Sequence, residues 1–168
     1  MSYAAVFAVN NFAQISTDDN SDSQQLSATE FPYVELPFLK NDIGSLNMKQ
    51  GKNLIAVFSP TDCGVCLSVL NFLNKSEAVN KDIRVIGIIN TPYRQAARKF
   101  QRVYNLNFPL LYDSLGVVKK TLNVDIKPAL VLVDSGIIQK KAIVGVREDI
   151  GKVNEILSLL NTTDEKNH

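Results

Sequence analysis

The sequence has few of the side chains that bind metal ions. Its 168 residues include a single histidine, His168, at the very end, and only two cysteines, Cys63 and Cys66. One Cys-x-x-Cys pair supplies half of a tetrahedral zinc site, and neither a second pair nor an internal histidine completes it. A zinc site would require two pairs shared by a dimer, so no metal centre is expected.

Long apolar runs are also missing. No stretch approaches the ~20 consecutive apolar residues that a membrane-spanning helix needs, and we expect no integral membrane span. The formal net charge is only +1, which gives no indication of a nucleic-acid partner or of binding to a charged membrane surface. The length suits one well-buried core rather than two.

The first part of the chain lacks positive charge. Residues 1–30 contain no lysine or arginine, and their acidic residues are Asp18, Asp19, Asp22 and Glu30. The apolar stretch 3–9 followed by polar residues could be the remnant of a signal peptide, although no basic residue precedes it. The composition favours a flexible polar segment over 1–30. We expect a folded domain over 31–161 and a C-terminal tail over 162–168.

From residue 31 the apolar pattern is that of an α/β domain without internal repeats. The continuous apolar run 54–58 predicts a strand that is buried on both faces, and 83–89 predicts a second buried strand. Two further strands, 129–133 and 137–144, are joined by a tight turn and predict a β-hairpin. A short alternating run at 33–36, stopped by Pro37, predicts an edge strand.

Apolar residues at helical spacing predict helices between and after these strands. The helices are expected over 63–76, 91–104, 115–122 and 147–160. The second has Thr91 as its N-cap, Pro92 at its first position and Val103 facing inward. In the last helix, Ile150 belongs to the apolar side.

One side of the helix predicted over 91–104 repeats an arginine at every fourth position. These residues are Arg94, Arg98 and Arg102. The ordinary interpretation is a face in contact with solvent. A docking surface for an acidic partner is the more specific alternative.

The two cysteines fall where the predicted strand 54–58 gives way to a helix, in the sequence Cys63-Gly64-Val65-Cys66. Two thiols with this spacing can close a disulfide with little movement of the backbone. The N-terminus of a helix has unpaired N–H groups and a positive dipole end, which favour a thiolate over a thiol. The sequence therefore predicts a redox centre.

Three segments, in this order, resemble the thioredoxin superfamily. They are 58–66, 107–113 and 127–134, the last followed by Gly136 and Gly145. Within the superfamily the chain is similar to extracytoplasmic thiol–disulfide oxidoreductases of the redoxin or cytochrome c maturation reductase type. The resemblance implies an α/β, thioredoxin-like fold with a central mixed β-sheet flanked by helices.

The resemblance also implies roles for three residues. Cys63 is the nucleophile and Cys66 the resolving residue, which agrees with the position of Cys63 at the helix start. Their redox-active disulfide takes the place of a cofactor. Pro128 is implied to be cis and to pack beside the disulfide, where its missing N–H leaves neighbouring backbone free to pair with a substrate strand.

Four further residues complete the candidate site that binds and positions the substrate. Asp62 directly precedes the motif; its charge disfavours a thiolate, although it could also serve as the helix N-cap. The positive charge of Lys127, on the proline loop, instead favours a thiolate. Pro60 and Thr61 belong to the segment that leads into the cysteines.

The chain departs from the family pattern at two positions where relatives carry a helper acid. Val57 stands at the position of the buried carboxylate of thioredoxins, and Val69 at the position of the acid often found in the cytochrome-maturation branch. The motif therefore offers no candidate base. Proton transfer would use water or a group of the incoming partner.

These observations predict an enzyme, a thiol–disulfide oxidoreductase that exchanges electrons with partner protein disulfides and more often reduces them than forms them. One alternative is a peroxiredoxin-like thiol peroxidase with antioxidant activity. The spacing argues against it, because Pro60 and Thr61 lie closer to Cys63 than the corresponding residues of peroxidases. A second is a non-catalytic, redox-sensing interaction module. The resemblance favours an extracytoplasmic location, periplasmic or membrane-associated, while a Cys-x-x-Cys pair works in the cytoplasm as well.

Overall fold

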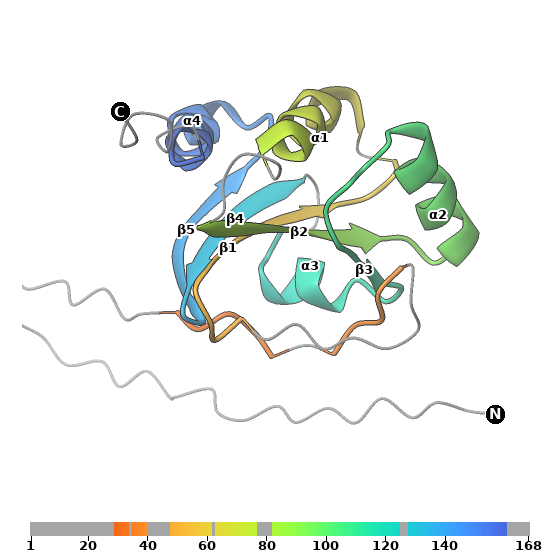
Figure 1. Ribbon diagram of the computed structural model, residues 1–168, viewed down its shortest axis with the longest axis horizontal. Coiled ribbons are helices and arrows are strands. Elements are labelled where there is room, and N and C mark those ends of the chain that lie inside the picture. The colour runs from red at the N-terminus through yellow and green to blue at the C-terminus, as the bar shows by residue number, and fades with distance from the viewer. Residues whose placement is uncertain are drawn as a thin grey trace, which may run out of the picture.

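The five strands within the described residues form one mixed sheet in the order β3-β2-β1-β4-β5 (Figure 1). The computed structural model describes residues 29–33, 35–39, 48–61, 63–76, 82–124 and 128–160, and only the backbone of residues 63–66 and 76. The strands are β1 Lys52–Phe58, β2 Ile83–Asn90, β3 Leu110–Asp113, β4 Ala129–Asp134 and β5 Ile137–Ile143. β1, β2 and β3 are parallel, whereas β4 runs antiparallel to both β1 and β5. This mixed sheet confirms the predicted α/β class.

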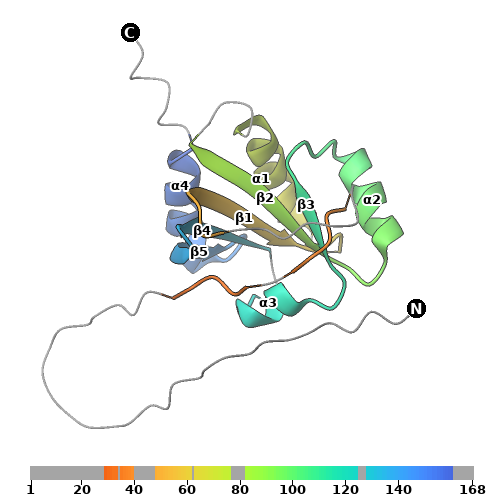
Figure 2. The same cartoon turned by 60° about the horizontal axis from the view of Figure 1, so that its bottom comes forward.

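The helices cover the two faces of the sheet unequally. They are α1 Cys63–Ser76, α2 Arg94–Val103, α3 Val117–Thr121 and α4 Ile150–Ser158, with a 3-10 turn, η1 Arg147–Asp149, before the last. Side chains of α1, α2 and α4 pack into one core, and those of α3 pack into another. Figures 1 and 2 show α3 alone on its side of the sheet.

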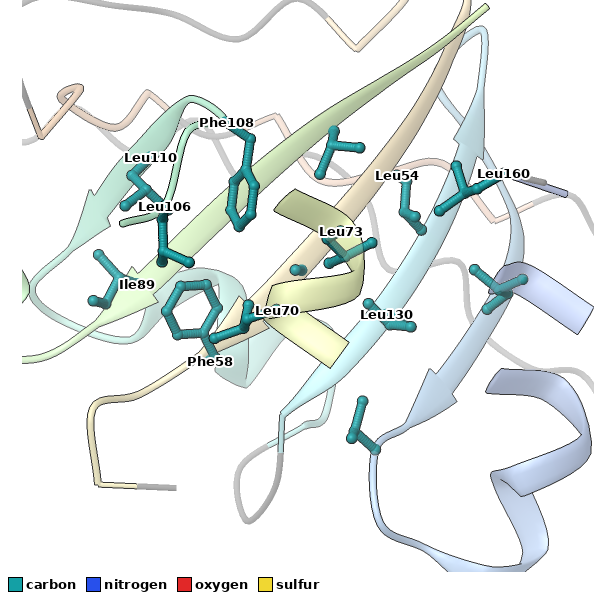
Figure 3. Close-up of a cluster of buried hydrophobic side chains, with 14 of the residues drawn as sticks. Leu54, Phe58, Leu70, Leu73, Ile89, Leu106, Phe108, Leu110, Leu130 and Leu160 are labelled. Carbon is teal, nitrogen blue, oxygen red and sulfur yellow. The ribbon is translucent and has the colours of Figure 1, made fainter. Parts of the chain in front are cut away.

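The face under α1, α2 and α4 is called the α1 side. Leu54 and Phe58 of β1 point to this face, and Leu70 and Leu73 of α1 pack over them (Figure 3). On the opposite face, the α3 side, lie the alternate residues of the same strand, Ile55 and Val57. Successive residues of a strand point to opposite faces, so a strand buried on both faces must be apolar at every position. The run 54–58 of β1 has this property, and β2 has it from Val85 to Ile89.

The chain before β1 crosses the α3 side of the sheet and joins its two outer strands (Figure 1). Residues 29–33 and 35–39 are called the edge strap. At the β5 edge, the Phe31 N–H donates to the Gly136 carbonyl at 2.8 Å, and an isolated bridge joins Glu30 to Ile137. At the β3 edge, an isolated bridge joins Phe38 to Leu111. Of the predicted edge strand 33–36, Val34 lies outside the described residues; Tyr33, Glu35 and Leu36 are not in a strand, and Glu35 forms only an isolated bridge.

Helix α2 begins at Arg94 and not at Pro92. The Thr91 hydroxyl accepts a hydrogen bond from the Tyr93 N–H at 3.3 Å, so it closes a turn before the helix instead of capping it. Tyr93, with extended backbone, is the N-cap. Val103 is the last helical residue and is 62% exposed, which corrects its predicted inward position.

Two other elements differ from the sequence-based expectations. β3 was not predicted as a strand, because no element was expected between the helices 91–104 and 115–122. Ile150 is 53% exposed, because α4 starts at this residue after η1 and its buried side is set later by Ile156.

Candidate functional site

The candidate site lies at the carboxyl end of β1, where the chain leaves the sheet and enters α1. Every residue of β1 after Lys52 is buried. The following turn is closed by side-chain hydroxyls: the Ser59 and Thr61 oxygens lie 2.9 Å apart, and the Thr61 N–H donates to the Ser59 hydroxyl at 3.4 Å. Pro60 is half-buried in this turn. Cys63 is then the first residue of α1, as the sequence predicted.

The base of this turn is anchored by aromatic packing. Phe58, the last residue of β1, is 1% exposed, and its ring centroid lies 5.6 Å from that of Phe100 in α2. Phe100 in turn packs against Tyr104 with centroids 4.5 Å apart. Tilted rings at these separations attract each other beyond their burial of apolar area. The strand end that leads to the cysteines is therefore held firmly against a second helix.

Pro128 is brought to the same edge of the sheet by strand register. Ala129, the first residue of β4, pairs antiparallel with Val57, so the residue before it lies beside the end of β1. Pro128 is buried, and its carbonyl accepts a hydrogen bond from the Val144 N–H at 2.8 Å. The turn 59–61, the start of α1 and the predicted proline therefore meet at one edge.

Part of the predicted site lies outside the described residues. Asp62 and Lys127 are not described, and neither is the Lys127–Pro128 bond that was expected to be cis. For Cys63 and Cys66 the backbone alone is given. The disulfide between them and the roles of these residues stay predictions.

The start of α1 offers Cys63 a helix dipole, which favours a thiolate, whereas the charge of Asp62 directly before it acts in the opposite direction. α1 is 14 residues long and has no acidic residue in its first turn. The positive end of the helix dipole is therefore not offset by a carboxylate within that turn. Such a position lowers the pKa of a cysteine in general.

No carboxylate occupies either position where a helper acid was sought. Val57 is 1% exposed and points to the α3 side, and Val69 is half-buried against the α1-side core. The described chain does contain two buried aspartates, Asp113 and Asp149. Both are engaged elsewhere, Asp113 with the first amides of α3 and Asp149 with β5 and α4.

The loops that follow β2 and β3 leave the sheet at the same edge and are fastened to each other. The Asn90 amide donates to the Asp113 carbonyl at 2.9 Å, and the Tyr112 hydroxyl donates to the Pro92 carbonyl at 2.9 Å. Sequence reasoning did not find this connection, because it links residues of two parallel strands through side chains that carry no motif. It gives the site a rigid flank on the side of α2.

Neither a metal centre nor a membrane span is found in what is described. Among the described residues no group of three or more histidine, cysteine or acidic side chains is close enough to hold a metal ion. The helices in this part of the chain are all too short or too polar to cross a bilayer.

Comparison with known proteins identifies a matching family. The model of the AhpC/TSA family matches residues 27–141, which include the cysteine motif and the predicted proline. No curated protein sequence is significantly similar to the chain.

Several solved structures share the fold. A secreted disulfide oxidoreductase of Mycobacterium tuberculosis, homologous to E. coli DsbE, has 22% identity and a TM-score of 0.62 over 77% of this chain and 95% of its own. A thiol-disulfide oxidoreductase from Bacteroides fragilis also has 22% identity and a TM-score of 0.62, over 76% and 99%. A thiol-disulfide isomerase from Corynebacterium glutamicum has 18% identity and a TM-score of 0.63, over 81% and 97%. These likenesses confirm the predicted thioredoxin-like fold of the redoxin type.

Proposed function

Because the chain belongs to the AhpC/TSA family and has the fold of thiol–disulfide oxidoreductases, we propose that it exchanges electrons with disulfides of partner proteins through Cys63 and Cys66. The observation that supports this most is the start of α1. Its first residue is Cys63, its first turn has no acidic side chain, and it follows a turn closed by hydroxyls at the end of a buried strand.

The exchange consists of two displacements at sulfur. The Cys63 thiolate attacks one sulfur of the partner disulfide; the partner S–S bond breaks, a mixed disulfide forms and one partner thiolate leaves. The Cys66 thiolate then attacks the sulfur of Cys63 and releases the second partner thiolate. The partner has gained two electrons and two protons, and the protein holds a Cys63–Cys66 disulfide. A dithiol reductant restores the starting state by the reverse steps.

Pro128 contributes to this reaction by shaping the edge at which the partner docks. It lies next to the end of β1 in the register of the sheet and has no N–H of its own. Backbone groups beside it are then free to pair with an extended segment of the partner. Lys127, Asp62, Pro60 and Thr61 complete this positioning set in the proposal.

Proton transfer in this protein depends on water or on the partner. The positions of the two helper acids are Val57 and Val69, and the buried aspartates of the described chain are bonded elsewhere. Deprotonation of Cys66 is therefore slower than where a carboxylate assists it. The second displacement, and not the first, is expected to limit turnover.

The test is reduction of a fluorescent disulfide peptide by the pre-reduced protein. Cys63→Ser is expected to abolish it, whereas Cys66→Ser is expected to complete the first displacement and stop at a stable mixed disulfide visible by mass spectrometry. Ser68→Ala, an exposed position on the same helix, serves as a matched control that keeps the wild-type rate. Unchanged reduction by Cys63→Ser would contradict the proposal.

A second candidate function, a thiol peroxidase with antioxidant activity, is supported by the match to the AhpC/TSA family. Against it, Thr61 stands only two residues before Cys63, closer than in the peroxidase pattern. Consumption of hydrogen peroxide by the reduced protein, abolished in Cys63→Ser, would favour the peroxidase. A redox-sensing module without catalysis would instead form the disulfide but reduce no substrate.

The proposed partners are proteins that carry dithiols or disulfides, and the proposed location is outside the cytoplasm. The similar protein of Mycobacterium tuberculosis is described as secreted. Disulfides of substrate proteins persist mainly in such oxidising compartments. Labelling the cysteines of intact cells with a membrane-impermeant thiol reagent tests this location.

A further inference from the structure

Helix α2 concentrates positive charge that the proposed reaction does not use. Its ten residues include three arginines and one lysine and no acidic residue. Four side chains at helical spacing, Gln95, Arg98, Lys99 and Arg102, are called the α2 basic face. The whole protein has a net charge of only +1, so this face is a local concentration and not part of a generally basic surface.

The α2 basic face is not neutralised by the rest of the described chain. Arg98, Lys99 and Arg102 are exposed, and no ion pair within the described residues involves them. Like charges at spacings of three and four residues repel one another on a helix. A surface that keeps three such charges together, with no counter-charge from the described residues, is suited to receive negative charge from another molecule.

The shape of the surface also favours an occupant. The same four side chains, with Gln101 and the buried Leu39, line an open hollow of about 650 Å³. Leu39 is 1% exposed and is held in place by its N–H, which donates to the Leu110 carbonyl at 2.8 Å. The hollow therefore has a polar, positively charged lining above the buried Leu39.

The opposite side of α2 connects this surface to the candidate site. Phe100 of α2 packs against Phe58, the last residue before the turn that leads to Cys63. Figures 1 and 2 show α2 beside the edge of the sheet where β1 and β2 end. A partner held on α2 therefore has its neighbouring residues within reach of the cysteines.

We propose that the α2 basic face docks an acidic polypeptide segment of the partner protein whose disulfide is exchanged at Cys63. This inference rests on the proposed function and adds the chemistry of its partner. Electrostatic complementarity of this kind speeds encounter and selects among partners. A folded or extended protein segment fits better than a nucleic acid, because nucleic-acid binding domains carry a large overall positive charge and this chain does not.

Two disulfide peptides test the inference. They are identical except that one carries a run of glutamates beside the disulfide and the other a run of glutamines. Reduction of the glutamate peptide by the pre-reduced protein is expected to be about tenfold faster at low ionic strength. The difference should vanish in about 1 M sodium chloride, where the Debye length is ~3 Å.

Matched variants assign the preference to α2. The triple variant Arg98→Gln, Lys99→Gln, Arg102→Gln should reduce both peptides at the rate of the glutamine peptide, and glutamine preserves the helix propensity of these positions. The control Lys52→Gln, Lys120→Gln, Arg147→Gln removes the same charge from exposed residues on other elements and should keep the preference. A preference that survives in the first variant, or falls equally in both, would overturn the inference.

Direct binding separates this inference from the proposed function. The Cys63→Ser, Cys66→Ser protein is titrated with disulfide-free versions of both peptides, an oligonucleotide and phosphatidylglycerol vesicles. Tighter binding of the glutamate peptide that is lost in the α2 triple variant supports the docking surface. If the peptide binds in this way but the wild-type protein reduces neither peptide, the oxidoreductase proposal fails and the docking surface stands. Tighter binding of the oligonucleotide or the vesicles through the same three residues would contradict an acidic protein partner.

Discussion

The two faces of the sheet are stabilised in different ways. On the α1 side three helices cover the sheet, and the buried phenylalanines Phe58 and Phe108 both belong to this core. On the α3 side the five-residue helix α3 contributes Val118, and further cover comes from Leu122 and Val124 after it, from the edge strap and from Met48. The face that supports the cysteine-bearing helix thus has the deeper apolar packing, and the other face relies more on the pairing of polar groups.

This difference follows from the length of the helices. A helix of five residues gains too few internal hydrogen bonds to repay its nucleation, so it forms only where other groups hold it. Asp113 stabilises α3: its two carboxylate oxygens accept hydrogen bonds from the N–H groups of Val117 and Val118 at 2.9 and 3.0 Å. The 14 residues of α1 instead present Leu70 and Leu73 to the core. A firm apolar base under α1 suits a site whose sulfur atoms must meet a partner in a fixed geometry.

Phe58→Ala should produce the largest loss of stability on the α1 side. It leaves a cavity beside Phe100 at the base of the site turn, and removal of a buried phenylalanine side chain costs about 3–5 kcal/mol. Val118→Ala on the α3 side is expected to cost less, about 1–3 kcal/mol. Urea denaturation followed by circular dichroism measures both, and equal costs would remove the contrast between the faces.

Asp113→Asn should weaken the α3 side specifically. One carboxylate oxygen becomes an amide that faces a buried N–H donor, and an unsatisfied buried donor costs about 1–3 kcal/mol. Hydrogen exchange should accelerate at the amides of α3 and stay unchanged in α1. The exposed neighbour Ser114→Ala is the control, and exchange that accelerates equally in both helices would contradict a local role of Asp113.

Asp149 makes the α1 side sensitive to acid. A hydrogen bond from Lys152 at 2.7 Å, and one from the Ile143 N–H at 2.6 Å, lower the pKa of Asp149 below its ordinary value of 3.8. A carboxyl whose pKa is lower in the folded than in the unfolded state stabilises the fold above the unfolded value, and this stabilisation is lost as the pH falls through the folded value.

Asp149→Asn should therefore reduce the free energy of unfolding at neutral pH and flatten its decline below about pH 4. Urea titrations at a series of pH values measure this. The exposed neighbour Glu148→Gln should keep the wild-type profile. An unchanged acid profile in Asp149→Asn would show that other carboxyl groups determine the sensitivity.

Glu155→Gln is expected to have the smallest effect. Glu155 of α4 pairs with Lys140 of β5, but its side chain is 59% exposed. Pairs in contact with solvent contribute about 0–1 kcal/mol, and salt screens them. The same urea titration should show a change within this range. A larger loss would mean that α4 depends on charge as α3 depends on Asp113.

The sequence predicted the elements that are buried on both faces and misjudged the short or partly exposed ones. The apolar run 54–58 lies within β1, and β2 is apolar from Val85 to Ile89, and the positions predicted for both strands were confirmed. β3 has only four residues, and its sequence shows neither the length nor the alternation that mark a strand. The predicted start of α2 was too early, because the Thr91 hydroxyl accepts a hydrogen bond from the Tyr93 N–H in a turn before the helix. Whether a threonine closes such a turn or caps a helix depends on local geometry and not on residue type.

The candidate site was likewise predictable where it depends on the local sequence pattern and not where it depends on tertiary contacts. The change from a strand pattern to a helix pattern placed Cys63 at the start of a helix, and α1 begins there. The position of Pro128 beside the end of β1 required the register of β4, which only the family resemblance suggested. The contact of Phe58 with Phe100 is a tertiary feature that the sequence alone did not predict. For the positive charge on α2, the sequence left two interpretations open, a face in contact with solvent and a docking surface for an acidic partner.

The edge strap has a consequence for how copies of the protein behave toward one another. One short stretch supplies hydrogen bonds to both outermost strands: Thr29 accepts from Ile138 of β5, and Pro37 accepts from Tyr112 of β3. Bare strand borders are templates on which identical chains add to one another. Removal of this stretch would therefore uncover both borders at once, and association of identical chains through their outer strands, rather than simple unfolding, is the damage against which these few residues protect.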